Sequence, residues 1–266
     1  MAARMIREQL VQTMDQSAMT NYPKNLSPAL QGPSWDATRQ YSAPWQSGLT
    51  GIAYNTKSTG PVTTITQLLT DPALKGKVTC LTEMRDTMGL IMLAQGADPE
   101  DFGDAEWDAA LAVLQDAVDS EQIRAFTGND YAQPLAKGDL AAAVAWSGDI
   151  YQLLSSNPKL KWALPTKGGM IWTDNMLIPT GGSAATASTY MNSVYDPKVA
   201  AQIAAYVAYV PPVKGTQEEL AKIDPELAKN PLVFPSDDDL AKTHQFDSAA
   251  LNNETYIEQW QKVLGA

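Results

Sequence analysis

One acidic residue interrupts an otherwise apolar strand pattern in the stretch 168–179, Gly-Gly-Met-Ile-Trp-Thr-Asp-Asn-Met-Leu-Ile-Pro. With the two-residue period of a β-strand, Asp174 is expected on one face with four large apolar side chains. These are Met170, Trp172, Met176 and Ile178. A carboxylate on such a face loses hydration unless a partner compensates it, and the nearest base comes before the strand. The partner is therefore either a set of backbone donors or a ligand, and an acid beside an indole suits an organic cation.

Further acids and a second indole stand where strands are expected to end and helices to begin. Glu83 and Asp86 follow the apolar run 78–81, and Trp146 ends the apolar run 140–146. In open α/β sheets, ligands bind at the carboxyl ends of strands. Each residue also has a purely structural interpretation. The two acids would complement a helix dipole, and Arg85 could pair with either of them. Trp146 could be a core residue, as tryptophan often is. Converging on one cleft, three carboxylates and two indoles would hold an extended aliphatic chain that carries ammonium groups.

Alternating patterns along the chain predict the elements that position these residues. Strands are expected at 41–45, 48–55, 78–81, 140–146, 160–164 and 170–178, and helices at 65–74, 85–95, 104–120, 130–137 and 149–156. The last third is predicted to be mostly helical, over 184–195, 197–208 and 252–264. The first 14 residues read as an amphipathic helix with Ile6, Leu10, Val11 and Met14 near one face. This alternation predicts an α/β fold with a largely parallel sheet.

Composition excludes several classes of function. The formal net charge of -11, from 30 acids and 19 bases among 266 residues, argues against nucleic acid as a partner and is compatible with cationic ligands. No apolar run approaches the ~18 residues of a membrane span. The single Cys80 and single His244 allow no intramolecular disulfide and no Cys/His zinc site. Cys80 lies in an apolar strand pattern, where a buried hydrophobe is expected, and no metal or cofactor is predicted.

At this point the residues match a known family. The chain resembles the polyamine (spermidine/putrescine) substrate-binding proteins of bacterial ABC importers. The matching segments, in order, are Tyr-Ser-Ala-Pro-Trp from 41 with Gly-Leu-Thr-Gly-Ile-Ala-Tyr-Asn from 48, Leu-Thr-Glu-Met-Arg-Asp from 81, Val-Ala-Trp-Ser-Gly-Asp from 144, the Trp-x-Asp strand at 168–179, and Ala-Tyr-Val-Pro-Pro from 208. The resemblance covers nearly the whole chain, and the Trp-x-Asp strand and the acidic helix start are its specific parts.

Carried over by resemblance, the amine-binding acids fall on Glu83, Asp86 and Asp174. The aromatic walls fall on Trp146, Trp172 and Tyr209, and a glutamine near the end of the cleft falls on Gln245. Two departures stand out. The family often has one extra residue before the helix acids, which affects Glu83 most, and an aromatic residue often stands where this chain has Ser47.

The resemblance implies a two-lobe, periplasmic-binding-protein-like (type II) fold with an incomplete first lobe. Lobe II would be residues 48–179, and lobe I would be residues 1–47 and 180–266. Strands at 48–55 and 170–179 would be hinges whose closure buries the ligand. The chain starts just after a Tyr loop of the family, so a preceding N-terminal segment with its export signal is expected to be missing; no signal peptide is visible in the chain.

The implied function is an extracytoplasmic receptor that binds spermidine or putrescine and delivers it to ABC permease subunits. The resemblance places it in the periplasm or at the cell surface as a lipoprotein. Another small amine, such as γ-aminobutyrate or an opine-like compound, is the alternative ligand. An enzyme on the same scaffold is disfavoured, because it would need a nucleophile and a base in the cleft.

Overall fold

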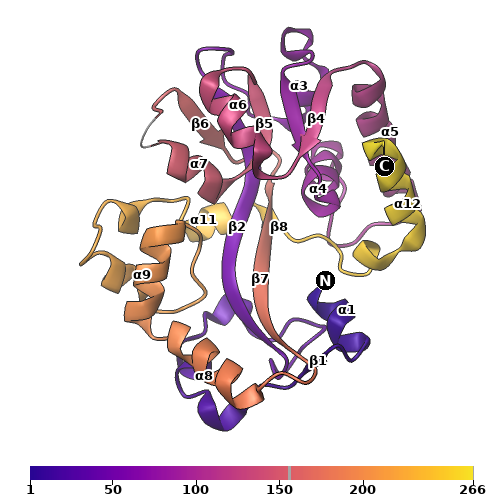
Figure 1. The fold of residues 1–266 in the computed structure, drawn as a ribbon. Coiled ribbons are helices and arrows are strands. Elements are labelled where there is room, and N and C mark those ends of the chain that lie inside the picture. The colour runs from indigo at the N-terminus through magenta and orange to yellow at the C-terminus, as the bar shows by residue number, and fades with distance from the viewer. Residues whose placement is uncertain (155–156, 266) are drawn as a thin grey trace. The chain divides into compact units, whose positions relative to one another are not determined.

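The computed structural model describes residues 1–154 and 157–265 of the chain. Their elements group into two compact units. Unit 1 comprises Met1–Gly48 and Thr173–Ser236, and unit 2 comprises Leu49–Trp172 together with residues 237–265. Two long strands, β2 (Ser42–Asn55) and β7 (Gly169–Pro179), contribute residues to both units (Figure 1). The mixture of alternating helices and strands confirms the predicted α/β class.

A mixed sheet forms the centre of unit 2, so the predicted largely parallel sheet is wrong: β2 runs antiparallel to both of its partners there, β5 (Ala142–Trp146) and β6 (Leu160–Ala163). The strand β3 (Val78–Leu81) pairs in parallel with β4 (Ile123–Thr127) and with β5. The second half of β2 pairs antiparallel with β5 on one side and with β6 on the other. Residues 140–145 are fully buried, as expected for a strand covered on both faces. This pairing places Thr50 of β2 opposite Trp146, at the end of β5.

Helices cover this sheet, and clear capping signals mark the end of one of them and the start of another. Helix α4 (Met84–Gln95) ends at Gly96, whose positive φ of 84° closes the helix in the left-handed conformation. Helix α5 (Asp104–Asp119) begins where the backbone N–H of Gly103 donates to Glu106 at 3.0 Å. A Cβ at Gly89 of α4 would lie 2.5 Å from the sulfur of Met170, so any larger residue there would require the Met170 side chain to shift. The other helices of unit 2 are α3 (Ile65–Thr70), α6 (Ala132–Lys137), α7 (Ser147–Leu154), α11 (Asp237–Leu240) and α12 (Glu254–Leu264), with 3₁₀ turns at Pro72–Leu74, Asn129–Tyr131 and Ala250–Asn252.

The C-terminal segment differs from the predicted lobe boundaries. Residues 237–265 lie in unit 2, whereas the sequence assigned them to the same lobe as residues 180–236. The reason is aromatic packing between α12 and α5: the rings of Trp107 and Tyr256 stack with centroids 4.3 Å apart. The Trp107 indole also donates to Gln259, and the Tyr256 hydroxyl donates to Asp104, each at 2.6 Å.

Unit 1 has a smaller core of its own. Its helices are α1 (Ala2–Arg7), α2 (Asn21–Asn25), α8 (Ala184–Val194), α9 (Pro197–Val207) and α10 (Thr216–Leu220), with 3₁₀ turns at Gln16–Ala18, Pro28–Leu30 and Leu227–Lys229. The rings of Tyr22 and Tyr195 meet edge to face at 4.7 Å, and their hydroxyls donate to the carbonyl oxygens of Ser42 and Pro44 in β2. The short strand β1 (Val11–Gln12) pairs antiparallel with the end of β7.

Several local predictions need correction. The expected N-terminal helix is shorter, because Val11 lies in β1 and no residue of α1 is buried. The two strands expected at 41–45 and 48–55 are one continuous strand. The strand β4 and the two-residue strand β8 (Thr243–His244), which pairs with β7, were not predicted. The predicted helix 149–156 corresponds to α7, and its last two residues lie outside the described ranges.

The strand that carries Asp174 is less buried than its pattern predicts. Met170 and Ile178 near its ends are each 1% exposed, but every residue from 171 to 177 is exposed or of intermediate burial. Asp174 itself is exposed. The expected desolvated acid on an apolar face is therefore wrong for this structure, since the flanking Trp172 and Met176 are only partly covered.

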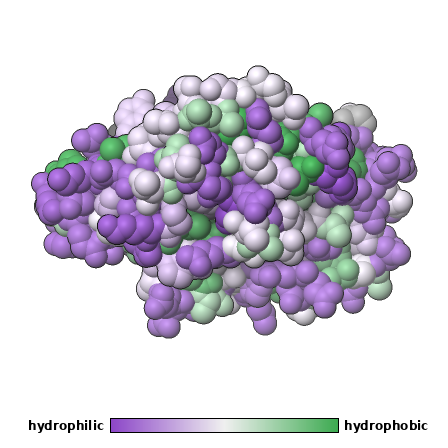
Figure 2. All heavy atoms as spheres, turned by 90° about the horizontal axis from the view of Figure 1, so that it is seen from below, coloured by the Kyte–Doolittle hydropathy of each residue, from purple (hydrophilic) through white to green (hydrophobic). Residues whose placement is uncertain are grey.

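Hydrophilic residues dominate the surface drawn in Figure 2, and hydrophobic residues appear on that face as small, separate patches. Such scattered apolar residues are normal for a folded protein. Within the described ranges, no helix combines the length and apolarity needed to cross a bilayer. Cys80 is fully buried in β3, and burial raises the pKa of its thiol to about 12, which agrees with the predicted role as a small core residue.

Candidate functional site

A polar cluster around the buried Asp86 lies at the start of α4. We call it the Asp86 cluster, and it comprises Thr50, Arg85, Asp86, Trp146 and Trp172. The chain leaves β3 at Leu81, and the Thr87 hydroxyl donates back to the Leu81 carbonyl oxygen at 2.9 Å, which fixes the turn into the helix. Asp86 lies in the first turn of α4, where a carboxylate complements the positive end of the helix dipole.

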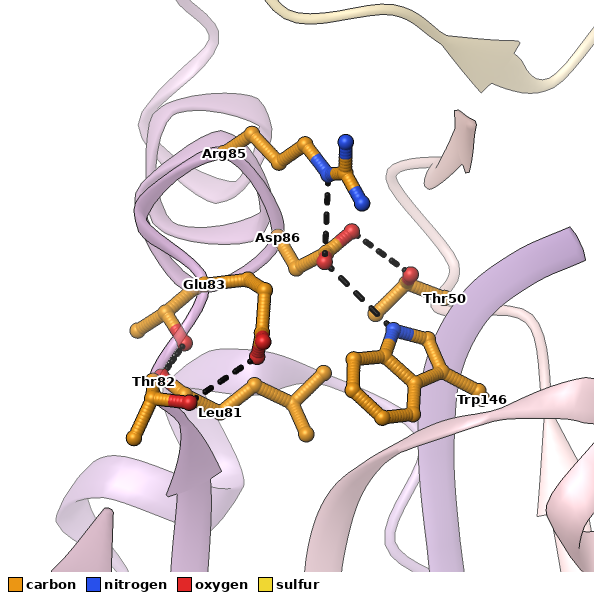
Figure 3. Close-up of polar contacts among 8 residues, drawn as sticks. Thr50, Leu81, Thr82, Glu83, Arg85, Asp86 and Trp146 are labelled. Carbon is orange, nitrogen blue, oxygen red and sulfur yellow. Dashed lines mark hydrogen bonds and ion pairs between the residues drawn. The ribbon is translucent and has the colours of Figure 1, made fainter. Parts of the chain in front are cut away.

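Asp86 is enclosed by partners from separate segments. Its Oδ1 accepts a hydrogen bond from the Thr50 hydroxyl at 2.7 Å, and its Oδ2 lies 3.4 Å from the indole nitrogen of Trp146 (Figure 3). Only 1% of the Asp86 side chain is exposed. Burial raises the pKa of Asp86 above its ordinary value, and the Glu83 charge also raises it, while Arg85, Thr50 and Trp146 oppose this shift. Asp86 is thus a buried carboxylate whose charge is only partly compensated by its partners in unit 2.

Arg85 supplies the cationic partner of that carboxylate. Its Nε lies 3.6 Å from Oδ2 of Asp86, and its guanidinium carbon lies 5.9 Å from the ring centroid of Trp172. A guanidinium at this distance from an indole ring is attracted to it. The Arg85 side chain is 37% exposed, so the cation covers the cluster from its solvent side.

Trp146 is held from both its backbone and its ring. Its backbone N–H donates to the Tyr131 hydroxyl at 3.0 Å, and that hydroxyl donates to Oδ2 of Asp149 at 2.8 Å. The Trp146 ring meets the Trp172 and Tyr131 rings edge to face, each with centroids 6.4 Å apart. The two predicted aromatic walls of unit 2 are therefore brought together, and each is only partly buried.

Glu83 is the accessible acid of this region. It is the N-cap residue of α4, and its Oε2 accepts a hydrogen bond from the Thr82 hydroxyl at 3.1 Å. Figure 3 shows the Glu83 carboxylate beside Thr82, while the Asp86 carboxylate is directed to Thr50 and Trp146. The two acids were expected to share one orientation in a helical turn, and they instead have different partners and different burial.

Asp174 and Tyr209 belong to unit 1, where Ser47 links their immediate neighbours. The hydroxyls of Ser47 and Thr173 lie 2.7 Å apart, and Ser47 exchanges two backbone hydrogen bonds of 2.9 Å with Val210. On the other side of Asp174, Asn175 accepts a hydrogen bond from the buried Arg39 guanidinium at 2.9 Å. We call Ser47, Asp174 and Tyr209 the Ser47 patch. In this patch the predicted acid Asp174 lies on a stretch of β7 whose neighbouring residues are fixed by hydrogen bonds.

Gln245 does not join the Asp86 cluster. It is exposed, and its backbone N–H donates to the Glu100 carboxylate at 2.9 Å. Glu100 follows the C-terminal end of α4, a helix of 12 residues, whereas Asp86 lies in its first turn. A helix of that length spans about 18 Å, so Gln245 and Asp86 are well separated within unit 2.

Within residues 1–154 and 157–265, no group of three or more His, Cys, Asp or Glu side chains is placed to hold a metal ion. Sequence reasoning missed Thr50 and Tyr131. Neither has a local signal, because Thr50 meets Asp86 only through the pairing of β2 with β5, and Tyr131 meets Trp146 only through the placement of α6.

The model of one known family matches residues 1–235, and that family is described as bacterial extracellular solute-binding protein. The chain belongs to this family. A spermidine/putrescine-binding periplasmic protein of Salmonella typhimurium is 24% identical to this solute-binding protein over 98% of the chain and 74% of the relative. The putrescine-binding periplasmic protein PotF of Escherichia coli is 24% identical over 90% of the chain and 69% of the relative.

The fold of the solute-binding protein is also shared with solved structures. A protein of Listeria monocytogenes, provisionally named a spermidine/putrescine ABC transporter, is 28% identical with a TM-score of 0.85, over 98% of this chain and 80% of that one. The predicted type II binding-protein fold is thereby confirmed. Membership in a solute-binding family also favours binding and transport over catalysis.

Proposed function

We propose that this solute-binding protein is the receptor of an ABC importer and that it captures a polyamine outside the cytoplasm, in the periplasm or at the cell surface. The relatives named above bind spermidine or putrescine, and they match over most of the chain. ABC permease subunits are the partners that such a receptor requires. The proposed ligand contacts are the indoles of Trp146 and Trp172, the carboxylates of Asp174, Glu83 and Asp86, the phenol of Tyr209, and Gln245 as the weakest member.

The observation that carries the proposal is the position of the Arg85 side chain, which is itself an organic cation bound by the Asp86 cluster. The Arg85 guanidinium lies over the Trp172 ring and beside a buried carboxylate, at 5.9 Å and 3.6 Å. An indole face with an adjacent acid is the surface that an alkylammonium group prefers, because the ring attracts the charge and covers the methylenes. Unit 2 therefore has the chemistry of an organic-cation site.

Calorimetric titration of the protein with putrescine, spermidine, γ-aminobutyrate and glutarate tests the proposal. The two polyamines are expected to bind, and glutarate is not. Trp172→Ala should weaken polyamine binding by at least tenfold, because the cation loses its aromatic face. Trp35→Ala, at a partly buried tryptophan of unit 1, is the matched control and should bind like the parent. Polyamine binding that is absent from the parent, or equal in the parent and Trp172→Ala, would contradict the assignment.

A further inference from the structure

We propose that Arg85 is a specificity-determining residue: its guanidinium is a built-in competitor that a ligand ammonium must displace from Asp86 and Trp172. This inference rests on the proposed function. It identifies the residue that limits how much positive ligand charge unit 2 accepts.

The geometry leaves no separate place for a ligand cation at Asp86. One carboxylate oxygen accepts from Thr50, and the other faces both Arg85 and the Trp146 indole. Asp86 is 1% exposed, so an ammonium group can contact it only if one of these partners moves. Thr50 is fully buried in β2, and Trp146 is anchored through Tyr131. Arg85 is the partner with a free path to solvent.

Arg85 is also weakly tied. Its ion pair with Asp86 is long, at 3.6 Å, and its Nε makes no hydrogen bond to any residue in the described part of the chain. A charged side chain that is 37% exposed can leave the cluster and hydrate its head group while its stem stays on the protein. The Thr50 and Trp146 hydrogen bonds remain to orient Asp86 for the incoming ammonium.

Charge counting gives the consequence for ligand choice. With Arg85 in place, the two acids at the start of α4, Glu83 and Asp86, are opposed by one cation, which leaves one net negative charge. The nearby acid Asp149 is already engaged by Tyr131 and Asn129. Unit 2 can therefore bind one ammonium group beside Glu83 while Arg85 stays in place. A second ammonium group must displace Arg85 from Asp86 in order to bind.

The test compares Arg85→Met, Arg85→Lys and the parent by calorimetric titration at pH 8 with putrescine, spermidine and γ-aminobutyrate. Methionine keeps an apolar stem on Trp172 and removes the charge, whereas lysine keeps the charge. Lys161→Met, at an exposed position of β6, is the control for loss of one positive charge from unit 2. Thermal melting of each variant establishes that it is folded.

Arg85→Met is expected to bind the polyamines about tenfold more tightly than the parent, with the larger gain for spermidine. Arg85→Lys and Lys161→Met should stay within about threefold of the parent. Equal or weaker polyamine binding by Arg85→Met, or the same gain in Arg85→Lys, overturns the inference while the proposed function stands. A loss confined to γ-aminobutyrate also overturns it, since Arg85 would then be a carboxylate ligand. Absence of polyamine binding by the parent and all variants overturns both.

A second measurement observes Arg85 directly in the parent protein. In ¹⁵N-labelled parent protein, the Arg85 Nε–H is buried, and saturating putrescine should release it to solvent and accelerate its exchange. Arg85→Lys, which lacks this resonance, assigns the signal. An Arg85 Nε–H that keeps its shift and exchange rate in saturating putrescine overturns the inference.

Discussion

Asp86 and Asp174 are both acids next to tryptophan in the predicted site, and the structure gives them opposite surroundings. Asp86 in unit 2 is sealed among Thr50, Trp146 and Arg85. Asp174 in unit 1 is exposed on β7, between two neighbours that are anchored to Ser47 and Arg39. A sequence pattern can therefore identify an unusual acid without showing whether its charge is available to a ligand.

The physical origin of the difference is desolvation. A buried carboxylate is tolerated only when hydrogen bonds and an opposite charge replace its hydration. Asp86 has both, and they tie it to the stability of unit 2. Asp174 keeps contact with water, so its charge costs the fold little and can be desolvated later by a bound cation. We therefore expect Asp86 to matter first for folding and Asp174 first for binding.

The largest effect is expected from Asp86→Ala. This change leaves the buried Thr50 hydroxyl and the Trp146 indole without their acceptor and removes the ion pair of Arg85. The free energy of unfolding, measured in urea, should fall by about 3 kcal/mol. Asp174→Ala should change it by no more than about 0.5 kcal/mol, as is usual at exposed positions. Equal losses in the two variants would abolish the contrast between the acids.

The next effect concerns binding at Asp174. Asp174→Asn should weaken putrescine binding by about 2 kcal/mol, which is about 30-fold, because the ammonium loses its charged acceptor. The urea unfolding midpoint should stay at the parental value. Calorimetry and urea unfolding on the same preparation give both numbers. Parental affinity in Asp174→Asn would show that this acid is a surface residue without a role in the site.

A smaller effect sharpens the description of the Asp86 side. Tyr131→Phe removes the hydroxyl that accepts from the Trp146 backbone and donates to Asp149. The unfolding free energy should fall by about 1.5 kcal/mol, because two hydrogen bonds are lost and each has a usual net value of about 0.5–1.5 kcal/mol. Tyr190→Phe is the control, since Tyr190 is 58% exposed. If both phenylalanine variants unfold at the parental urea concentration, Tyr131 does not hold Trp146 in place.

The smallest effect is a pH dependence of the unfolding free energy that Asp86 should contribute. Its pKa is raised in the folded protein, mainly by burial, above the ordinary value of 3.8. An acid with a raised folded pKa stabilises the fold below 3.8, and this contribution is lost as pH rises through the folded pKa. The free energy of unfolding of the parent should therefore fall relative to that of Asp86→Asn as the pH increases from 3.8. A difference that is flat across this window, or that slopes the other way, would mean that Arg85 and the hydrogen bonds outweigh burial.

Much of the fold could be predicted from local patterns, but the pairing of distant segments could not. The order of strands and helices followed from apolar periodicity and from stop signals such as Gly96. Strand β4 was missed because its sequence, Ile-Arg-Ala-Phe-Thr, has too weak an alternation to distinguish it from a loop. The place of α12 depends on the stacking of Tyr256 on Trp107, residues 149 positions apart, which no local pattern encodes.

For the candidate site as well, local patterns identified individual residues but not their long-range partners. The residues Glu83, Asp86 and Trp146 were found because they follow strands, and the structure brings Asp86, Trp146 and Trp172 into one cluster. What the sequence could not give was the state of Asp86. That state depends on Thr50, from a strand 36 residues away, and on the direction taken by the Arg85 side chain.

The glycine at position 89 has a consequence for how mutational data on this protein should be read. Any side chain there would overlap the buried Met170 side chain, which would have to shift within the contact between α4, which carries Arg85 and Asp86, and β7, which carries Trp172. A saturation library scored for transport would then record position 89 as intolerant, with the profile of a contact residue, although it touches no cargo. Compensating changes are expected at Met170, where a shorter side chain would restore the clearance, and such paired tolerance would separate scaffold positions from true recognition positions.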